Sequence, residues 1–500
     1  MTLFFTLVVL ILLAGLVFLA RRRRYDYNLA VIGGGAAGLV SAYIAAAVRA
    51  RVILIEKGRM GGDCLNTGCV PSKALLRSAQ VLQLARRGEE FGLRTGEPTA
   101  DFAAVMARVQ RVIARVAPHD SAERYRGLGV EVTQGQARLL DAHTLDIDGR
   151  RISARKVIVA TGARPVLPPI PGIETVQPLT SDTVWELRER PQRLLVLGGG
   201  PIGCELAQAF QRLGCAVTLV QRGPRLLPRE DAEIGQHIAA RLGDEGIQVL
   251  TGHTARRFEA SDNQHSLVCA HEHGERRITF DRVLVALGRR ANTEGLGLEA
   301  LGIQADASGR LPADGRLRTS HPDVYVCGDV TGPYQFTHSA AHQAWYAAVN
   351  ALFAPLVRFH VDYRVIPWAT YTAPEVARVG LNEEQAQAQG IAHEVTRFDL
   401  DELDRAITEG EASGWVKVLT PPGSDRILGA TIVGAHAGEM IAEFVLAMRH
   451  GLGLKKILAT IHVYPTLNEA NKYAAGEWRR RHAPEGLLRW LARFHAWRRG

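Results

Sequence analysis

One pattern occurs twice in this chain of 500 residues: an apolar strand, a glycine turn of the form GxGxxG and a helix. The first copy covers residues 27–58 (YNLAVIGGGAAGLVSAYIAAAVRARVILIEKG) and the second residues 193–223 (RLLVLGGGPIGCELAQAFQRLGCAVTLVQRG). In such a turn the first glycine permits a tight bend, the second admits a pyrophosphate and the third lets helix and strand pack closely. The pattern predicts an α/β protein with two Rossmann-like dinucleotide-binding domains.

The residues after each turn indicate different nucleotides. Glu56 ends the second strand of the first copy, 18 residues after Gly38, where an acid can hold ribose hydroxyls of FAD or NAD. The same spacing in the second copy reaches Gln221, which Arg222 follows, and an arginine there accommodates the 2′-phosphate of NADP. Arg225 is a further candidate for that phosphate, although it could simply be a solvated side chain. The predicted glycine contacts are Gly33, Gly35, Gly38, Gly198, Gly200 and Gly203.

Three further apolar strands end at residues suited to a long cofactor. VIVATGARP contains Gly162, VLVALGRRAN contains Gly288, and VYVCGDV delivers Asp329, whose carboxylate can bind a sugar-like hydroxyl. Two nucleotide sites in one chain predict an electron relay rather than a single dehydrogenase.

Two cysteines stand five positions apart in GGDCLNTGCVPSK, residues 61–73. Cys64 and Cys69 could form a structural staple, a metal clip or a redox pair. Zinc is disfavoured because CxxxxC has no second ligand pair at a finger-like distance, and no metal ligand is predicted. The remaining cysteines are scattered and are predicted to be buried packing residues: Cys204, Cys215, Cys269 and Cys327.

Taken in order, these motifs resemble the class I pyridine nucleotide-disulfide oxidoreductases, which include dihydrolipoamide dehydrogenase, glutathione reductase and mercuric reductase. The similarity runs from about Tyr25 to Lys472, and GGxCxNxGCxPSK is its most specific part. It implies FAD and a homodimer in which the partner completes each active site, and Gln221 with Arg222 adds a preference for NADPH over NADH. It also implies a C-terminal α+β dimerisation domain. The expected segments are 1–24 (anchor and basic stop), 25–176 and 291–362 (FAD-binding), 177–290 (NAD(P)-binding), 363–476 (dimerisation) and 477–500 (basic tail).

The resemblance also implies roles for individual residues. Cys64 and Cys69 would form the redox-active disulfide, with Cys69 facing the flavin and Cys64 attacking the substrate. Lys73 would reach the flavin, and Glu205 would be its ion-pair partner. The weaker assignments to FAD are Ala137, in the stretch GQA, and Thr337, which joins Asp329 on the ribityl side.

The sequence departs from the family near its C-terminus. Family members that reduce organic disulfides carry a histidine before Pro-Thr, and this chain has Tyr464 there, with Glu469 at the family's glutamate spacing. A phenol with a pKa of about 10 is a poor base at neutral pH. His462 is a possible substitute. Asp63, before Cys64, is also unusual, because many relatives have threonine there.

Both ends of the chain carry charge and apolar residues. The formal charge is +9, and it is concentrated in residues 21–24 and 478–500, so the body offers no basic face for nucleic acid. Residues 2–20 are apolar and precede RRRR, which predicts an uncleaved transmembrane helix with the catalytic body in the cytoplasm. In the tail, Leu487, Trp490, Leu491 and Phe494 recur at helical spacing between arginines. That helix is predicted to lie on membrane lipid or to pack on a partner subunit.

The preferred hypothesis is a mercuric-reductase-like enzyme that passes electrons from NADPH through FAD to the disulfide and on to an acceptor. A metal ion, a small disulfide and a quinone all remain possible acceptors. The first alternative is a dihydrolipoyl dehydrogenase with an altered acid-base residue. The second is a tethered flavin redox sensor with little turnover, which the presence of Cys64, Cys69 and Lys73 disfavours.

Overall fold

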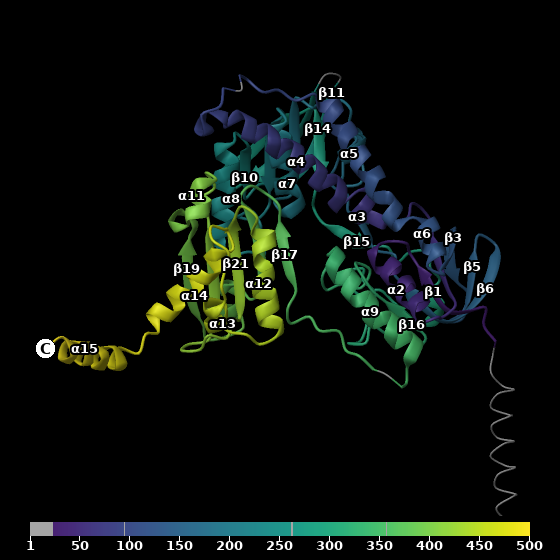
Figure 1. Ribbon diagram of the computed structural model, residues 1–500. Coiled ribbons are helices and arrows are strands. Elements are labelled where there is room, and N and C mark those ends of the chain that lie inside the picture. Colours follow the sequence, from purple (N-terminus) through teal and green to yellow (C-terminus); the bar gives the residue numbers. More distant parts are fainter. Residues whose placement is uncertain (1–23, 95, 262–263, 357) are drawn as a thin grey trace, which may run out of the picture. The chain divides into compact units, whose positions relative to one another are not determined.

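The computed structural model describes residues 24–94, 96–261, 264–356 and 358–500 (Figure 1). The chain forms two compact units, each assembled from separate segments. Of these described residues, unit 1 contains those within 24–62, 117–163 and 291–361, and unit 2 contains those within 63–116, 164–290 and 362–500. Two of the boundaries between them fall within the strands β7 (Ala163–Pro165) and β15 (Arg289–Ala291), and the others fall after residues 62, 116 and 361.

Unit 1 is built on a seven-stranded sheet that contains the first glycine turn. Its order is β3-β2-β1-β6-β5-β4, with β16 paired to β6. The strands β3, β2, β1, β6 and β16 run parallel, whereas β4, β5 and β6 form an antiparallel meander. The strands are β1 (Tyr27–Ile32), β2 (Val52–Glu56), β3 (Glu131–Gln134), β4 (Ala137–Leu139), β5 (Thr144–Ile147), β6 (Arg150–Val159) and β16 (Val324–Val326).

Alternating apolar residues of β1 bury both faces of this sheet. Leu29 and Val31 pack with α2 and α9, while Ala30 and Ile32 pack with residues of the meander. Because successive side chains point to opposite faces, a parallel strand covered on both faces requires such a continuous apolar run. The helices of unit 1 are α2 (Ala36–Ala47), α6 (Ala122–Gly127) and α9 (Thr337–Phe353).

Unit 2 contains the second glycine turn in a four-stranded parallel sheet of order β10-β9-β8-β14. A three-stranded antiparallel sheet, β11-β12-β13, follows β10 in the chain. These strands are β8 (Arg193–Leu197), β9 (Ala216–Gln221), β10 (Gln248–Thr251), β11 (Thr254–Ser261), β12 (Gln264–His271), β13 (Gly274–Phe280) and β14 (Arg282–Val285). The helices around them are α4 (Cys69–Arg86), α5 (Phe102–Val116), α7 (Pro201–Arg212) and α8 (Ala232–Asp244).

The C-terminal part of unit 2 is a five-stranded antiparallel sheet with helices against it. Figure 1 shows α12 beside the sheet, whose order is β17-β18-β21-β20-β19. Its strands are β17 (Pro367–Thr370), β18 (Glu375–Gly380), β19 (Glu394–Asp399), β20 (Trp415–Thr420) and β21 (Gly429–Gly434). Its helices are α10 (Glu383–Ala388), α11 (Asp404–Thr408), α12 (Ala437–Arg449), α13 (Leu454–Ala459) and α14 (Glu469–Arg481). This α+β arrangement agrees with the fold expected for the dimerisation region.

The four scattered cysteines are packing residues, as predicted. Cys204, Cys215, Cys269 and Cys327 are buried in the apolar cores of the two units. Burial raises the pKa of the Cys215 thiol to about 12 and that of Cys269 to about 11, so neither is a nucleophile at neutral pH.

The membrane anchor in the predicted fold class requires correction. A bilayer span needs roughly 20 apolar residues, and none of the helices that the structure describes meets that need. The apolar helix α2 has only 12 residues, while α4, with 18, carries Lys73, Arg77 and Arg86. Residues 2–20 themselves lie outside the described residues. We therefore withdraw the transmembrane helix, the anchored location with its cytoplasmic body, and membrane lipid as a partner.

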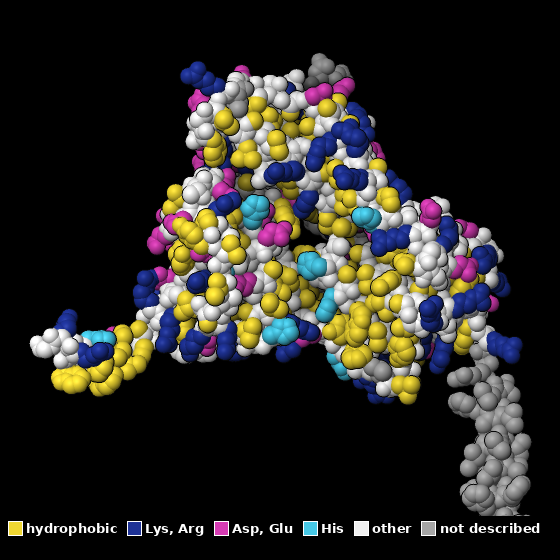
Figure 2. Space-filling view, viewed as in Figure 1, with side chains coloured by type: hydrophobic (Ala, Val, Ile, Leu, Met, Phe, Trp, Pro, Cys, Tyr) yellow, Lys and Arg dark blue, Asp and Glu magenta, His cyan; other side chains and the backbone are white. Residues whose placement is uncertain are grey.

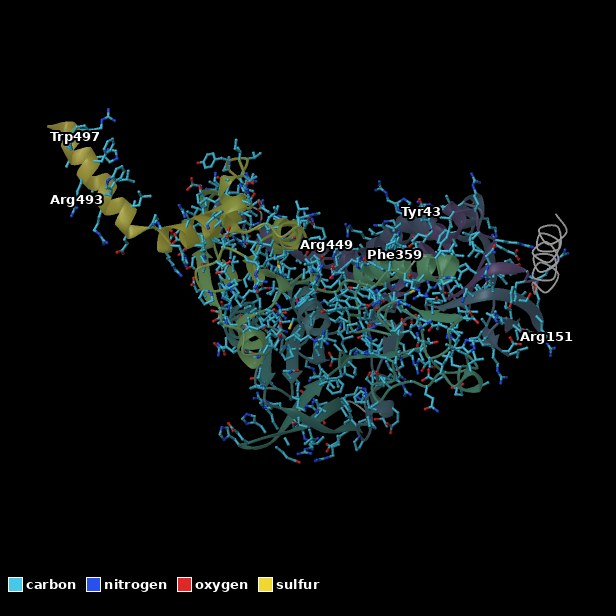
Figure 3. All side chains as sticks on the ribbon, turned by 90° about the horizontal axis from the view of Figure 1, so that it is seen from below. Tyr43, Arg151, Phe359, Arg449, Arg493 and Trp497 are labelled. Atoms are coloured by element: carbon cyan, nitrogen blue, oxygen red, sulfur yellow. The ribbon has the colours of Figure 1, made fainter. Side chains whose placement is uncertain are left out.

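The tail forms the predicted helix, α15 (Glu485–Arg499). None of its residues is buried within the chain, and Figure 2 shows its hydrophobic side chains gathered along one side. Arg493 and Trp497 mark this helix in Figure 3. Packing of the tail on a partner subunit stays a prediction.

Candidate active site

The two cysteines of the GGxCxNxGCxPSK motif lie on consecutive helices, and both belong to unit 2. Cys64 is half-buried in the short helix α3 (Gly62–Asn66), and Cys69 is exposed as the first residue of α4. Orphan backbone N–H groups and the helix dipole give the first turn of α4 a positive potential. A thiolate at Cys69 is therefore favoured over one inside the helix.

Lys73 lies one helical turn after Cys69. Its side chain contacts two residues from other parts of the unit, Glu205 and Tyr371. Its Nζ is 2.8 Å from Oε2 of Glu205, on α7, and 4.2 Å from the centre of the Tyr371 ring. The other oxygen of Glu205 accepts a hydrogen bond from the backbone N–H of Tyr371 at 2.9 Å. The Glu205 side chain is only 7% exposed, so these two partners replace the hydrogen bonds that water would otherwise give its oxygens. The structure thus brings the predicted pair Lys73 and Glu205 together.

Asp63, directly before Cys64, is held by partners that the sequence analysis missed. It forms an ion pair with Arg289, and the hydroxyl of Thr67 donates to its Oδ1 at 2.6 Å. A second carboxyl, Asp182, has its pKa raised by burial and by the negative charge of Asp63. Trp185 Nε1 donates to the carbonyl of Thr67 at 2.8 Å and fixes the loop between the cysteines. Arg289 is 226 residues from Asp63, and only its position in GRRAN hinted at a role.

In unit 1 the glycine turn has the close approach expected of a dinucleotide fold. A Cβ at Gly38 would lie 1.7 Å from the carbonyl oxygen of Gly33, so only glycine permits this contact between helix and turn. Glu56 accepts hydrogen bonds from the backbone N–H groups of Gly34 at 2.5 Å and Gly58 at 2.7 Å. These bonds keep the carboxylate at the end of β2, beside the turn.

The second turn, in unit 2, repeats this geometry with an amide in place of the acid. A Cβ at Gly203 would lie 1.8 Å from the carbonyl oxygen of Gly198, and nothing lies within 4 Å of the Cβ position at Gly200. Gln221 Oε1 accepts from the N–H of Gly199 at 3.0 Å, as Glu56 does from Gly34. The open cradle at Gly200 suits a pyrophosphate on the N-terminus of α7.

The two arginines after Gln221 differ in their surroundings. Arg222 is exposed beside the end of β9. Arg225 is bound by Glu384, at 2.6 Å between Nη1 and Oε1. Arg225 is therefore already neutralised by a carboxylate, which leaves Arg222 as the better candidate for a 2′-phosphate.

The weaker cofactor candidates take the following places. In unit 1, Ala137 is buried at the start of β4, Gly162 follows β6, Asp329 follows β16, and Thr337 is the first residue of α9. In unit 2, Gly288 follows β14. Asp329 and Thr337 thus flank one connection between a parallel strand and a helix, where ligands of open α/β sheets bind.

Tyr464, in the family's histidine position, is held by an acid. Its side chain is exposed, and its hydroxyl donates to Oδ2 of Asp404 at 3.0 Å. This hydrogen bond to a carboxylate raises the pKa of Tyr464 above its ordinary value, so the phenol keeps its proton. Glu469 begins α14, is buried, and accepts from the N–H of Thr466 at 3.2 Å.

His462 is not placed to substitute for the missing histidine. Its side chain is 5% exposed, with Nε2 at 2.9 Å from Glu443 and Nδ1 at 3.1 Å from the carbonyl oxygen of Thr460. Asn468 and Asn471 also donate to Glu443. Both ring nitrogens are therefore engaged inside the subunit, which argues against a role for His462 at a substrate thiol.

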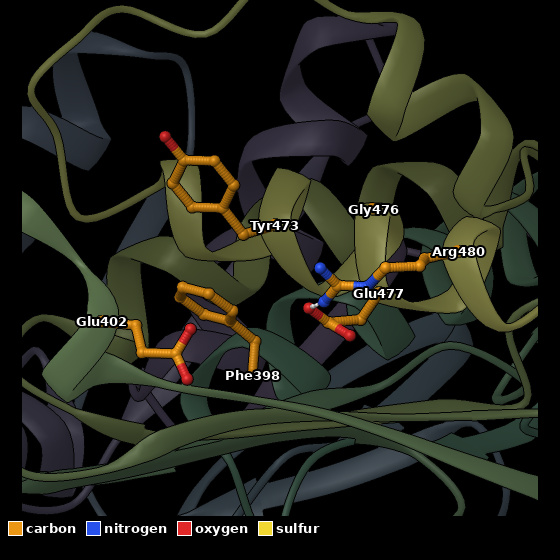
Figure 4. A pocket seen from close by; sticks show the side chains of 6 residues that line it. All are labelled: Phe398, Glu402, Tyr473, Gly476, Glu477 and Arg480. Atoms are coloured by element: carbon orange, nitrogen blue, oxygen red, sulfur yellow. Dashed lines mark ion pairs between the residues drawn. The ribbon is translucent and has the colours of Figure 1, made fainter.

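A cavity of about 390 Å³ lies in the C-terminal part of unit 2, which also carries Tyr464 (Figure 4). Its walls come from β19, η6 (Leu400–Glu402) and α14, and Asp404, the partner of Tyr464, follows η6 in the chain. Arg480 and Glu477 form an ion pair in its wall. The lining residues are Phe398, Glu402, Tyr473, Gly476, Glu477 and Arg480.

Comparison with known proteins decides the family. The profile described as pyridine nucleotide-disulphide oxidoreductase matches residues 27–344, more than half of the chain. The chain belongs to this family. The profile of the family's dimerisation domain matches residues 366–475, which supports a homodimer. Members bind FAD and use NAD(P)H, so this protein is a flavoprotein disulfide oxidoreductase.

Several relatives of this oxidoreductase are similarly close. Mercuric reductase of Staphylococcus aureus is 36% identical over 450 residues, which is 90% of this chain and 82% of the relative. Dihydrolipoyl dehydrogenase of Thermus scotoductus is 38% identical over 458 residues, which is 90% of this chain and 96% of the relative. Among solved structures, the Cu(II) complex of the HOCl-induced flavoprotein disulfide reductase RclA from Escherichia coli has a TM-score of 0.81 at 29% identity. That match covers 91% of this chain and 99% of the other.

Proposed function

We propose that this oxidoreductase passes electrons from NADPH through Cys64 and Cys69 to a metal ion, as mercuric reductases do. The observation that carries the proposal is the hydrogen bond from Tyr464 to Asp404. It leaves a protonated phenol where a disulfide-reducing relative has an imidazole. A disulfide substrate needs a proton shuttle for its leaving thiol. A soft metal ion needs thiolate ligands and no such shuttle.

In this proposal Cys64, Cys69 and Lys73 each have one task. FAD, when bound, supplies the two-electron relay between the nicotinamide and the disulfide. Cys69, at the N-terminus of α4, is the thiol on the flavin side, and Cys64 is the thiol that meets the acceptor. Lys73, paired with Glu205, favours the electron-rich form of the cofactor through its positive charge.

The nucleotide turns supply the two binding sites. In unit 1, the glycine turn, Glu56, Asp329 and Thr337 would hold FAD. In unit 2, the open cradle at Gly200 would hold the pyrophosphate of NADPH, with Arg222 on its 2′-phosphate. In a homodimer of the family's kind, Tyr464 of one subunit would face the cysteine pair of the other.

The names of similar proteins support a metal ion as the electron acceptor, and they also support a dihydrolipoyl dehydrogenase. Mercuric reductases and a Cu(II) complex occur among the similar proteins, but dihydrolipoyl dehydrogenases are equally similar. A dihydrolipoyl dehydrogenase with an altered base is therefore the second candidate, favoured by the retained Glu469.

The deciding experiment measures NADPH consumption by the purified protein with Hg(II) and with lipoamide side by side. Turnover with Hg(II) but not with lipoamide is the expected result. Rapid turnover with lipoamide would contradict the proposal and favour the dehydrogenase. Thiols that NADPH reduces, without acceptor-stimulated consumption, would instead indicate a redox sensor.

A further inference from the structure

A tight hairpin in unit 2 carries three potential metal ligands in consecutive positions. β12 ends at His271 and β13 begins at Gly274, so Glu272 and His273 form a two-residue turn. His271 pairs with Gly274 across the hairpin, and Gly274 adopts a positive φ of 118° that allows the tight reversal. Because the turn already fixes the backbone of all three residues, a chelate here would order little additional chain.

The donor atoms lie at separations that suit one ion. Nε2 of His273 and Oε1 of Glu272 are 3.4 Å apart. Two ligands bound at about 2.1 Å around a tetrahedral ion would be roughly 3.4 Å apart. One donor atom from each of His271, Glu272 and His273 lies within 4.8 Å of the other two. Small rotations of two side chains would therefore complete a three-ligand site.

One hydrogen bond shows that Nδ1 of His271 points toward the turn. Its Nδ1 accepts from the backbone N–H of His273 at 3.4 Å, which is long for such a bond. The nitrogen that accepts this bond has its lone pair directed toward the turn. A metal ion would replace this weak contact with a strong bond to the same lone pair.

A third histidine supports the ring of His271. His253 comes from the turn between β10 and β11 and stacks on His271, with ring centres 4.3 Å apart and planes 19° apart. His253 is buried, and its Nδ1 lies 2.7 Å from the carbonyl oxygen of Thr251, which fixes its orientation. It acts as a positioning residue for His271, in the way that outer residues orient metal-bound imidazoles.

The ligand chemistry selects a class of ion. Two imidazoles and a carboxylate suit borderline divalent ions such as Cu(II), Zn(II) and Ni(II), whereas softer ions prefer thiolates. The side chains of Glu272 and His273 are 77% and 82% exposed, so an ion can reach them from solvent. As a plain surface ion pair, Glu272 and His273 would contribute little to stability. We propose that His271, Glu272 and His273 form a binding site for a borderline divalent metal ion on this hairpin.

The test uses untagged, FAD-loaded protein in which Cys64→Ser and Cys69→Ser remove the two cysteines that are not buried. Cu(II) is titrated by calorimetry and the bound ion is examined by electron paramagnetic resonance. We expect a Cu(II) signal with nitrogen ligands. The added pair His271→Asn and His273→Asn should weaken binding at this site by at least about tenfold. The matched control is His495→Asn, which removes an exposed histidine from α15 and should change nothing.

The same titration separates the roles of the histidines. His253→Gln should weaken Cu(II) binding while the nitrogen signature of the bound ion persists, because it removes a support and not a ligand. Unchanged Cu(II) affinity in the pair His271→Asn and His273→Asn would overturn the proposal. A protein with both histidines that binds no Cu(II) at micromolar concentrations would overturn it as well. These outcomes do not depend on the electron acceptor.

Discussion

The hydroxyl of Tyr464 donates to Oδ2 of Asp404 at 3.0 Å, so the side chain in the family's histidine position is a hydrogen-bond donor already committed to an acid. Because the carboxylate raises the pKa of the phenol, Tyr464 stays protonated throughout the neutral range. It cannot accept the proton of a substrate thiol in that state.

Replacing this tyrosine by the family's residue is expected to change the acceptor. Tyr464→His should raise lipoamide turnover by about 10²-fold or more, since a positioned general base contributes that much. Steady-state NADPH consumption with lipoamide and with Hg(II) measures the change. Tyr473→His, on the neighbouring helix α14, is the matched control and should not give lipoamide turnover. Lipoamide activity that stays at the starting level in Tyr464→His would show that the missing base is not what limits the reaction.

The two cysteines are expected to differ in their optical signature. Cys69→Ser should abolish the long-wavelength charge-transfer absorbance from thiolate to flavin after two-electron reduction, because Cys69 is the proposed thiol on the flavin side. Cys64→Ser is the matched control and should retain it. Anaerobic titration with NADPH measures the band. Its survival in Cys69→Ser would mean that the two roles are exchanged.

Features of the site that arise within one short segment could be predicted from the sequence. The glycine turns and the cysteine pair are local patterns, and Lys73 and Glu205 were paired through the resemblance. The partners of Asp63 and Tyr464 could not be predicted in this way. Arg289 and Asp404 lie 226 and 60 residues away, and only the packing of the chain brings them close.

Two features of the structure depend on packing that the sequence does not show. His462 shares an extended segment with Tyr464, and that spacing suggested a common role. Its pairing with Glu443 depends on how α12 packs and does not appear in a local pattern. The sequence HEH at residues 271–273 does not by itself indicate a metal site. The structure adds that Glu272 and His273 form a two-residue turn, which brings the three side chains together.

The pair Lys73 and Glu205 is expected to act on both stability and the cofactor. Lys73→Met leaves the Glu205 carboxylate buried with only one partner, which should lower the free energy of unfolding by about 1–3 kcal/mol. It should also make the flavin harder to reduce, because a positive charge is lost. Denaturant titration and a redox titration measure the two effects. Adding Glu205→Gln should recover part of the stability but not the potential, and full recovery of both would contradict the proposed electrostatic role.

The choice of nucleotide is expected to depend on Arg222. Arg222→Ala should raise the Michaelis constant for NADPH by about tenfold or more and change that for NADH little, because only NADPH carries the 2′-phosphate. Arg225→Ala is the matched control, since Glu384 already neutralises that guanidinium, and its ratio of the two constants should stay near the starting value. Equal effects of Arg222→Ala on both nucleotides would remove the basis for an NADPH preference.

Glu375, the first residue of β18, is expected to make stability depend on pH. Its Oε2 accepts from the N–H of Gly438 at 2.9 Å, but burial is the larger influence and raises its pKa. The folded state therefore holds the proton more tightly than the unfolded chain does. Its stabilising contribution is complete below the unfolded pKa, about 4.3, and is lost as pH rises through the higher folded pKa.

Glu375→Gln keeps a hydrogen-bond acceptor for Gly438 without the titrating charge. The loss of unfolding free energy between pH 4.5 and pH 8, measured by denaturant titration at fixed protein concentration, should be smaller in this variant than in the parent protein. Glu485→Gln, on the exposed tail, is the matched control and should leave the profile unchanged. If Glu375→Gln has the same pH profile as the parent, burial does not hold a proton on this carboxyl, and its charge must be compensated by groups around Gly438.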